Sequence, residues 1–500
     1  NTAKNEGGAL WNGTGTMLLI NCDIDGNIAN GATPANGGGG VFNNGGVLNI
    51  NANTQIINNK ADGILGSGGG IHSNGGAVVV TGTTISANQA VRAGGGIEIS
   101  GGSFVMNNVT LTDNDAGVTL GANPGNGGGL HITGAIDITI NGGLIQNNAA
   151  QEGGGLWNGA GVMDINGVTI TNNRAVGANT GGGAIFNNGN GTVAIDAATT
   201  LSANIATGVT PGGRGGAIFN NTNGILNLTS GLTINGNYAS RAGGAIEDAS
   251  GGTLMLTGIT LEGNSAGADI GLGTMANPGN GGAIHLSGAT SATILNSTIR
   301  NNQAAQEGGG LWNNTGMMTV TGSTISGNIA SGNLADDGGG AIFNNGGTLD
   351  ILAGTSINNN RANGTSGSGG GILSTAGTVT IADILITENY ANRAGGGIEV
   401  IDGALNLNGT VIAFNDVNGT AGTPNPGNGG GIHISGATTT IINDASIAAN
   451  LAFNQGGGLW NQEGSTMSVF NTMVNLNKAV SGSGGGGIYN NGGELGVING

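Results

Sequence analysis

The chain has little charge, few aromatic residues and almost no cysteine or proline. Charged residues make up 7% of its 500 residues and aromatic residues 3%, with six prolines and one cysteine. A protein that binds nucleic acid needs a basic stripe, and ten Lys and Arg in a chain of net charge −17 cannot supply one. No nucleic-acid partner is therefore expected.

The sequence predicts neither an intrachain disulfide nor a membrane-spanning helix. Cys22 has no second cysteine with which to pair, and this scarcity suits an exported bacterial protein. The sequence has no apolar stretch of about 20 residues, and Asn1 begins neither a signal peptide nor a lipidation motif. We expect no membrane-spanning segment, and a soluble chain, or part of a longer one, that is secreted to the cell surface.

Glycine is abundant, with 111 residues. Such a composition usually indicates disorder, but here the glycines recur in register with aliphatic residues, which indicates a repeat. The segment 151–175, QEGGGLWNGAGVMDINGVTITNNRA, represents one unit of it. After the glycine run, apolar and polar residues alternate with the period of two that is typical of half-buried strands.

The aliphatic residue that follows each glycine run marks one coil of a solenoid. These anchors recur about every 30 residues, a spacing typical of solenoid repeats, and predict about 17 coils. The anchors are Leu10, Val41, Ile71, Ile97, Leu130, Leu156, Ile185, Ile218, Ile246, Ile284, Leu311, Ile342, Ile372, Ile398, Ile432, Leu459 and Ile488.

Each coil closes on an aliphatic residue, two variable residues, Asn, one variable residue and Ala. Asn in the same place of stacked strands can bond to the amides above and below, so these residues predict a ladder. With three short strands per coil, the all-β fold expected is a single parallel β-helix, in which neighbouring coils satisfy each other's backbone. The ladder residues are Asn27, Asn59, Asn88, Asn114, Asn148, Asn173, Asn204, Asn237, Asn264, Asn302, Asn328, Asn360, Asn389, Asn415, Asn450 and Asn477.

A longer repeat of five coils lies above the single coil. The motif GG[AG]LWN recurs at Leu10, Leu156, Leu311 and Leu459, about every 150 residues. The predicted super-repeats are approximately 6–151, 152–306, 307–454 and a partial 455–500, within one continuous domain 1–500. Neither end carries a polar capping repeat, so we expect a fragment of a longer parent chain or subunits that stack end to end.

The repeat resembles the polymorphic outer-membrane-protein repeats of bacterial autotransporter passengers. The resemblance rests on the closing apolar-x-x-Asn and on GGAI, and covers essentially the whole chain. Two features differ from that family, because its Phe is mostly Ile or Leu here and no membrane-barrel domain is present. The resemblance implies a right-handed β-helix that serves adhesion or surface architecture. GGAI occurs with its alanine at Ala184, Ala217, Ala245, Ala283 and Ala341.

The residue after each anchor should face outward, and together these residues form one column. The column contains every Trp and every His of the chain. One interpretation is an exposed contact stripe that stacks on sugars or anchors a protein; the other is that long loops cover the rings as a small satellite core. In coil order the column comprises Trp11, Phe42, His72, Glu98, His131, Trp157, Phe186, Phe219, Glu247, His285, Trp312, Phe343, Leu373, Glu399, His433, Trp460 and Tyr489.

Three Glu/His pairs within the column invite an acid/base interpretation, because the partners lie one coil apart. An active site is usually singular, whereas these pairs repeat every five coils, so partly covered ion pairs are favoured and no catalytic residue is predicted. Two ligands are too few for zinc, and no metal site is predicted. The pairs are Glu98/His131, Glu247/His285 and Glu399/His433, with Arg92, Arg241 and Arg393 as assisting cations.

Two weaker patterns remain. The motif NPGNGG occurs at 123–128, 277–282 and 425–430. Acidic residues near these loops make calcium an alternative, although no dense acidic motif occurs, and we otherwise expect no cofactor. These are Asp113, Asp115, Glu262, Asp269 and Asp416.

Outward threonines form a hydroxyl array of the ice-binding kind, although Thr is simply favoured on exposed strands and the array fails at Leu385 and Val411. They are Thr84, Thr110, Thr169, Thr200, Thr233, Thr260, Thr298 and Thr324.

The sequence thus predicts a non-enzymatic structural or adhesive surface protein, a rod or fibre segment. Its expected partners are further copies of itself, joined end to end or laterally, or a glycan or neighbouring cell surface. The alternative is a carbohydrate-binding or carbohydrate-active β-helix, a lyase or glycosidase, which would cluster carboxylates with Arg or Lys on one outer face. Acidic residues here are sparse and scattered.

Overall fold

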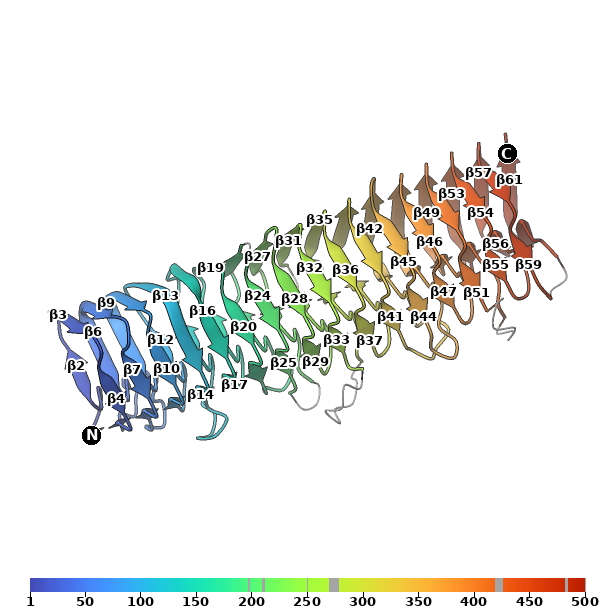
Figure 1. The fold of residues 1–500 in the computed structure, drawn as a ribbon. Helices are drawn as coiled ribbons and strands as arrows, with labels where there is room; N and C mark the ends of the chain where they lie inside the picture. The colour runs from blue at the N-terminus through green and yellow to red at the C-terminus, as the bar shows by residue number, and fades with distance from the viewer. Residues whose placement is uncertain are drawn as a thin grey trace. The chain divides into compact units, whose positions relative to one another are not determined.

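The computed structural model describes residues 1–196, 198–208, 212–249, 251–268, 278–418, 426–481 and 484–499. Within those ranges the secondary structure consists of short strands paired in parallel, with no helix. The chain divides into two compact units, Asn1–Ser240 with Ala245–Thr253, and Arg241–Gly244 with Leu254–Gly500. Each unit is a parallel β-solenoid (Figure 1), which confirms the predicted fold class.

One coil shows how the repeat becomes structure. It contains β18 (Leu156–Asn158), β19 (Val162–Asn166), β20 (Thr169–Thr171) and β21 (Arg174–Ala175). The first three are the predicted strands, and the fourth is a two-residue strand that carries the closing motif. In β19 the burial alternates with every residue, because a strand presents successive side chains to opposite faces.

The glycine run is required by the backbone. Gly153 has φ of +61°, in the left-handed region that glycine adopts without strain. A Cβ on Gly154 would come within 2.5 Å of the backbone nitrogen of Arg174 and of the carbonyl oxygen of Gly183 in the next coil. Side chains are therefore excluded where the coil turns and neighbouring coils approach most closely.

The anchor residues stack in register within each unit, as the spacing predicts. Leu156 pairs with Leu130 on one side and Ile185 on the other, and the same pairing links the anchors throughout each unit. The anchor strands are β2 (Leu10–Asn12), β6 (Val41–Ile50), β9 (Ile71–Thr81), β12 (Ile97–Ile99), β15 (Leu130–Ile132), β18, β22 (Ile185–Asn187), β26 (Ile218–Asn220), β30 (Ile246–Asp248), β34 (Ile284–Leu286), β38 (Leu311–Asn313), β42 (Ile342–Leu352), β45 (Ile372–Ala382), β48 (Ile398–Val400), β52 (Ile432–Ile434), β56 (Leu459–Gln462) and β60 (Ile488–Asn491).

The middle strands follow the anchor strands and are in several coils continuous with them. The separate middle strands are β3 (Thr16–Leu19), β13 (Ser103–Thr112), β16 (Ile138–Gln146), β19, β23 (Thr192–Ile195), β27 (Ile225–Leu228), β31 (Thr253–Thr257), β35 (Ser291–Leu295), β39 (Met317–Thr321), β49 (Gly403–Asn408), β53 (Thr438–Asn443), β57 (Thr466–Phe470) and β61 (Glu494–Ile498).

The third strands present a mostly polar outer face. They are β4 (Asp23–Asp25), β7 (Gln55–Ile57), β10 (Thr84–Ser86), the ends of β13 and β16, β20, β24 (Thr200–Ser202), β28 (Thr233–Asn235), β32 (Thr260–Glu262), β36 (Thr298–Arg300), β40 (Thr324–Ser326), β43 (Ser356–Asn358), β46 (Leu385–Thr387), β50 (Val411–Ala413), β54 (Ser446–Ala448) and β58 (Met473–Asn475). Their threonines stand in register, as in Thr84 with Thr110, but Leu144 interrupts the row in the first unit.

Within each unit the closing strands form a sheet of their own. They are β1 (Thr2–Ala3), β5 (Ile28–Ala29), β8 (Lys60–Ala61), β11 (Gln89–Ala90), β14 (Asp115–Ala116), β17 (Ala149–Ala150), β21, β25 (Ile205–Ala206), β29 (Tyr238–Ala239), β33 (Ser265–Ala266), β37 (Gln303–Ala304), β41 (Ile329–Ala330), β44 (Arg361–Ala362), β47 (Tyr390–Ala391), β51 (Asp416–Val417), β55 (Leu451–Ala452) and β59 (Lys478–Ala479). Their second residue is buried in nearly every coil, which explains the small Ala of the motif.

The asparagine ladder is confirmed in both units. In the first, the side-chain amide of Asn88 donates to Oδ1 of Asn114 at 3.0 Å, and that of Asn114 donates to Oδ1 of Asn148 at 2.9 Å. In the second, Asn328 donates to Asn360 at 2.9 Å. These amides are almost fully buried, so each rung replaces hydrogen bonds that water would otherwise make.

No helix that is long and apolar enough to cross a membrane occurs among the residues described.

Candidate functional site

The column that follows the anchors is in register, but it lies largely beneath the surface. Trp157 pairs with His131 on one side and Phe186 on the other. The exposed fractions of Trp157, Phe186 and His131 are 9%, 3% and 4%, whereas Trp11 is 51% exposed. The two interpretations of the column differ in exposure, and for most of its rings the structure has the covered arrangement.

The glycine runs supply the cover. A Cβ on Gly153 would approach the Cβ of Phe186 to 3.1 Å, and one on Gly308 would approach the Cβ of Trp312 to the same distance. The backbone of the run therefore lies directly against the column. Besides Trp11, only Tyr489 keeps partial exposure among the aromatic members; Phe42, Phe186, Phe219, Phe343, Trp157, Trp312 and Trp460 are buried.

The buried rings form short stacks that repeat with the five-coil period. The rings of His131 and Trp157 are 4.3 Å apart and nearly parallel, and those of Trp157 and Phe186 are 5.8 Å apart. In the second unit His285 and Trp312 are 4.2 Å apart, as are His433 and Trp460. The stacked rings form aromatic satellite cores outside the main core, around Trp157 in the first unit and Trp312 in the second.

Each tryptophan in the column also has a polar partner five residues earlier. The indole nitrogen donates to Glu6 from Trp11, to Glu152 from Trp157, and to Glu307 from Trp312, at 3.2, 3.3 and 2.9 Å. Trp460 donates instead to Gln455 at 3.4 Å. These partners went unrecognised in the sequence, although the spacing in QEGGGLW could have revealed them.

Glu98 and His131 are in buried contact in the first unit. His131 Nδ1 lies 2.8 Å from a carboxylate oxygen of Glu98, whose side chain has no exposed surface. Arg92 approaches the other oxygen at 3.4 Å, and the Thr133 hydroxyl donates to it. Burial opposes ionisation of Glu98, but His131, its hydrogen bond and Arg92 outweigh burial and lower the pKa of Glu98 to about 2.

The Glu399/His433 pair repeats this arrangement in the second unit. His433 Nδ1 lies 3.3 Å from Glu399 and Arg393 Nη1 lies 2.9 Å from it. The Ser435 hydroxyl takes the place of Thr133. Burial again opposes ionisation of Glu399, but His433 and Arg393 lower its pKa to about 2. Covered contacts between Glu and His, with Arg92 and Arg393 beside the carboxylates, thus occur in both units.

Glu247 lies in the first unit and His285 in the second. Glu247 is fully buried at the side chain, and its charged neighbour in the first unit is Arg214 at 3.8 Å. The sequence pattern did not identify Arg214, which comes from the loop before the third coil of the block. The guanidinium of Arg214 also lies over the Phe219 ring at 5.9 Å.

A second polar ladder, not anticipated from the sequence, borders the column. Asn158 donates to Oδ1 of Asn187 at 2.8 Å, Asn187 to Asn220 at 2.7 Å, and Asn220 to Asp248 at 2.9 Å. These residues are the third of each anchor strand and are buried. The column is therefore held between a polar ladder inside and the glycine backbone outside.

The acidic residues considered for calcium have other contacts. Asp115 accepts from the backbone nitrogens of Val118 and Thr119, and Glu262 pairs with Arg300 at 2.8 Å. Asp269 lies outside the residues described. Across the described ranges, no group of three or more His, Cys, Asp or Glu side chains is placed to hold a metal ion.

No family model, no curated protein and no solved structure matches this chain. The resemblance to polymorphic outer-membrane-protein repeats therefore rests on the GGAI and apolar-x-x-Asn motifs. The structure agrees with that resemblance at the level of a parallel β-solenoid with asparagine ladders.

Glu307, the hydrogen-bond partner of Trp312, is expected to make the free energy of unfolding depend on pH. Burial raises the pKa of Glu307 to about 7, against the opposing hydrogen bond from Trp312. Because the folded pKa lies above 4.5, the carboxyl stabilises the fold fully below pH 4.5, and this contribution is lost as the pH rises through 7. We expect wild type to lose at most about 3 kcal/mol of unfolding free energy between pH 5 and pH 8 from this group.

The matched variant is Glu307→Gln, which copies the residue found naturally at Gln455. Its unfolding free energy should change less between pH 5 and pH 8 than that of wild type, measured by urea denaturation at each pH. An identical pH dependence in both proteins would contradict the assignment.

Proposed function

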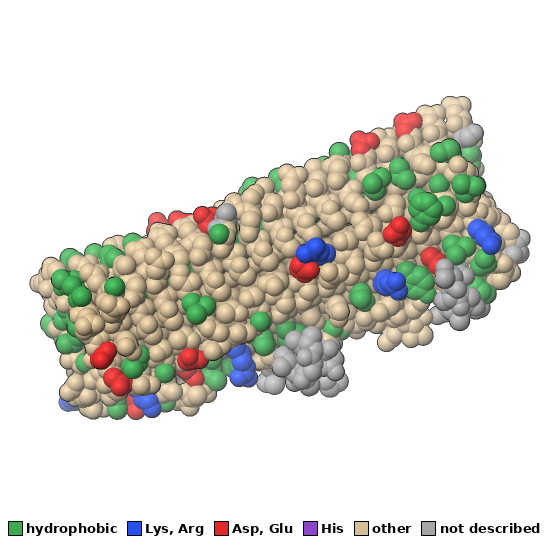
Figure 2. Space-filling view, viewed as in Figure 1, with side chains coloured by type: hydrophobic (Ala, Val, Ile, Leu, Met, Phe, Trp, Pro, Cys, Tyr) green, Lys and Arg blue, Asp and Glu red, His purple; other side chains and the backbone are tan. Residues whose placement is uncertain are grey.

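We propose that this protein is a non-enzymatic structural and adhesive surface protein, a secreted rod or fibre segment that binds a partner through an apolar patch on its second unit. The observation that carries the proposal is a change in the outer face of the third strands. In most coils this face begins with Thr or Ser, but in three of the last four coils of the second unit it begins with Leu385, Val411 or Met473, and Ser446 stands between the last two. Figure 2 shows apolar side chains gathered on a surface that is otherwise mostly polar.

The apolar patch comprises residues of β46, β50, β54 and β58 and of the turns after them. Leu385 is 49% exposed, Phe414 64%, Met473 55% and Leu476 82%. Leu385 pairs in register with Val411, and Ser446 lies between Val411 and Met473 in the same row. Contiguous exposed apolar side chains of this kind mark interaction sites in soluble proteins.

Backbone strain at two patch residues supports a role in binding. Phe414 and Leu476 have φ of +58° and +56°, in the left-handed region that is costly for bulky side chains. The same turn position carries Asn301 and Asn359 in other coils of the unit, with φ of +56° in each. Asn tolerates this conformation, so the bulky residues cost stability and expose apolar surface, which selection for folding alone would not favour.

The column supports the non-enzymatic part of the proposal. The side chains of Glu98, Glu247 and Glu399 have no exposed surface, so a substrate has no direct access to them. Each lies beside an arginine, and Glu98 and Glu399 also accept a hydrogen bond from a hydroxyl, an arrangement typical of structural ion pairs. The covered rings likewise leave the apolar patch as the more accessible contact surface.

Replacement of Phe414 by Asn together with Leu385 by Thr tests the proposal. We expect binding to weaken at least tenfold, because both exposed apolar side chains are lost, while stability stays unchanged or rises as the strain at position 414 is relieved. Self-association is measured by sedimentation velocity across a concentration series, and surface binding by retention on immobilised cell-surface glycans and proteins.

The matched control is Met255→Thr, which removes another exposed apolar side chain outside the patch, 48% exposed in wild type. It should bind as wild type does. Unchanged association and retention in the Phe414→Asn/Leu385→Thr variant, or an equal loss in the control, would overturn the role of the patch.

A further inference from the structure

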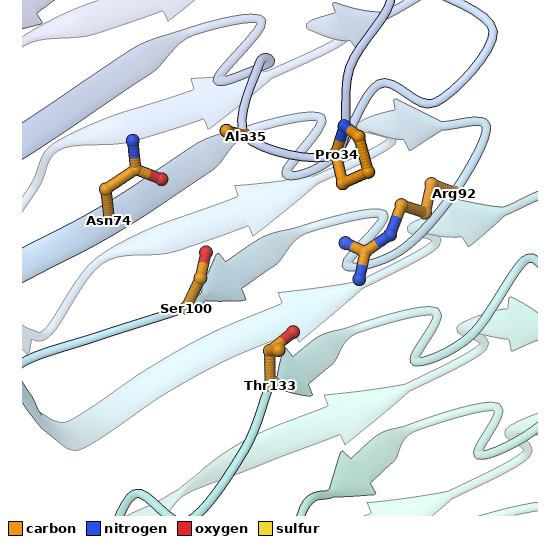
Figure 3. Close-up of a pocket in the computed structure, with 6 residues that line it drawn as sticks. All are labelled: Pro34, Ala35, Asn74, Arg92, Ser100 and Thr133. Carbon is orange, nitrogen blue, oxygen red and sulfur yellow. The ribbon is translucent and has the colours of Figure 1, made fainter.

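We propose that a cavity over the first block of the column binds a single uncharged sugar ring. The cavity has a volume of about 210 Å³ and is lined by Pro34, Ala35, Asn74, Arg92, Ser100 and Thr133. Figure 3 shows the side chains of Asn74, Arg92, Ser100 and Thr133 arranged around one open space, with the Pro34 ring at its edge. All six residues belong to the first unit, so the inference is independent of the apolar patch.

The cavity exists because two positions that are apolar in the second unit carry the polar residues His72 and Ser100 in this block. His72 is fully buried, and its Nε2 lies 2.8 Å from the Ser100 hydroxyl. In the second unit the corresponding residues are Leu373, which is fully buried, and Ile401, which packs against the Trp312 and Phe343 cluster. Ser100 is smaller than Ile401, so the space that Ile401 fills in one block is open in the other.

Arg92 is correspondingly freer than its counterpart Arg393. Arg393 Nη1 donates to the Ser368 hydroxyl at 2.9 Å, to Glu399 at 2.9 Å and to the carbonyl of Ala335 at 3.4 Å. Arg92 Nη1 donates to Ser67 at 2.9 Å and to Glu98 at the longer distance of 3.4 Å. In the described part of the chain its other nitrogens have no hydrogen-bond partner, so they remain available to an acceptor on a ligand.

The polar groups at the cavity suit a molecule with both donors and acceptors. The Thr133 hydroxyl donates its proton to Glu98, so its oxygen is left as an acceptor. The Asn74 side chain offers an amide donor and a carbonyl acceptor, and Arg92 offers donors only. Sugar hydroxyls can form hydrogen bonds with all three side chains, and the C–H edge of a sugar ring can lie on Pro34 and Ala35.

Size and charge narrow the ligand class. At about 30 Å³ per water, the cavity holds roughly seven waters, which is the scale of one sugar ring rather than a chain. Arg92 already shares its charge with Glu98, whose carboxylate is buried beside it. Arg92 is the one charged side chain among the six lining residues and Glu98 already balances it, so an uncharged sugar is favoured over a uronic acid.

The test uses the whole chain with methyl β-D-glucopyranoside and its galacto and manno isomers as probes. Saturation-transfer NMR should show at least one of them bound, with a dissociation constant on the order of millimolar. The variant His72→Leu/Ser100→Ile copies the apolar pair of the other block without leaving an unpaired histidine, and should weaken binding at least tenfold. Asn74→Ala, which removes one polar group, should also weaken binding.

Thr375→Ala is the matched control, since Thr375 occupies in the second unit the place of Asn74. It should leave binding unchanged, and circular dichroism should show that all variants retain their strands. Three outcomes would overturn the inference: no saturation transfer to the wild-type chain from any probe, equal binding by the His72→Leu/Ser100→Ile variant, or tighter binding of methyl glucuronide than of the uncharged glycosides.

Discussion

Replacement of Asn148 by Ala is expected to lower the free energy of unfolding of the first unit by about 3–5 kcal/mol. The Asn148 amide donates to the carbonyl of Leu111 and to Oδ1 of Asn173, each at 2.9 Å. Its Oδ1 accepts from the backbone nitrogen and the side-chain amide of Asn114, at 3.0 and 2.9 Å. All these groups are buried, so the variant leaves several of them without a partner in a site that water does not reach.

Asn166→Ala is the matched control for the ladder. Asn166 also donates its amide to an asparagine one coil away, to Asn141 at 3.0 Å, but from the outer face of β19. Solvent can replace that bond, so the loss should stay below about 1 kcal/mol. Urea denaturation followed by circular dichroism measures both; equal losses in the two variants would show that burial does not set the strength of a rung.

The coil and its ladder could be predicted because each depends on residues at a constant spacing. Leu156 and Asn173 recur in every coil, and parallel strands place equivalent residues in register without further information. The same spacing identified the column of Trp157, His131 and Glu98. Their register was therefore predictable from the sequence as fully as that of the core.

The burial of the column could not be predicted in the same way. Whether Trp157 is exposed depends on the path of the glycine run over it, and glycines carry no side chain whose periodicity would reveal that path. The indole partner Glu152 precedes the run, and Arg214 reaches Glu247 from a loop of different length. Contacts made by loops depend on loop geometry, which a repeat pattern does not record.

The apolar patch escaped the sequence interpretation for a related reason. In the sequence, Leu385 and Val411 were identified only as positions where threonine is missing from the row. That observation does not show that they belong to an apolar surface. Phe414 lies at a turn position whose left-handed φ becomes evident only from the backbone. Once the strands are aligned, these residues and Leu476 lie on one face and form the apolar patch.

Replacement of Glu98 by Gln is expected to lower the free energy of unfolding of the first unit by about 3 kcal/mol at pH 7. The pKa of Glu98 falls from 4.5 to about 2 in the folded chain, and each unit of pKa corresponds to about 1.4 kcal/mol. Gln keeps an oxygen that can accept from the Thr133 hydroxyl but has no charge to pair with His131 and Arg92. Removing one partner of a buried ion pair leaves the others desolvated without compensation.

The pH dependence separates this loss from a packing defect. Because the folded pKa of Glu98 is lowered, its contribution is fully present above pH 4.5 and is lost as the pH falls toward 2. Wild type should therefore lose stability over that interval, and Glu98→Gln should lose less, so the two proteins converge in acid. A packing defect would instead keep the difference between them constant with pH.

Glu262→Gln is the matched control for the ion pair. Glu262 pairs with Arg300 at 2.8 Å, but the two side chains are 35% and 49% exposed, so water screens the interaction. Its removal should cost less than about 1 kcal/mol and leave the acid slope of wild type unchanged. Thermal denaturation at pH 7, 4.5 and 3 gives both quantities. A Glu98→Gln variant that kept the full acid slope would contradict the lowered pKa, because another group would then have to supply that slope.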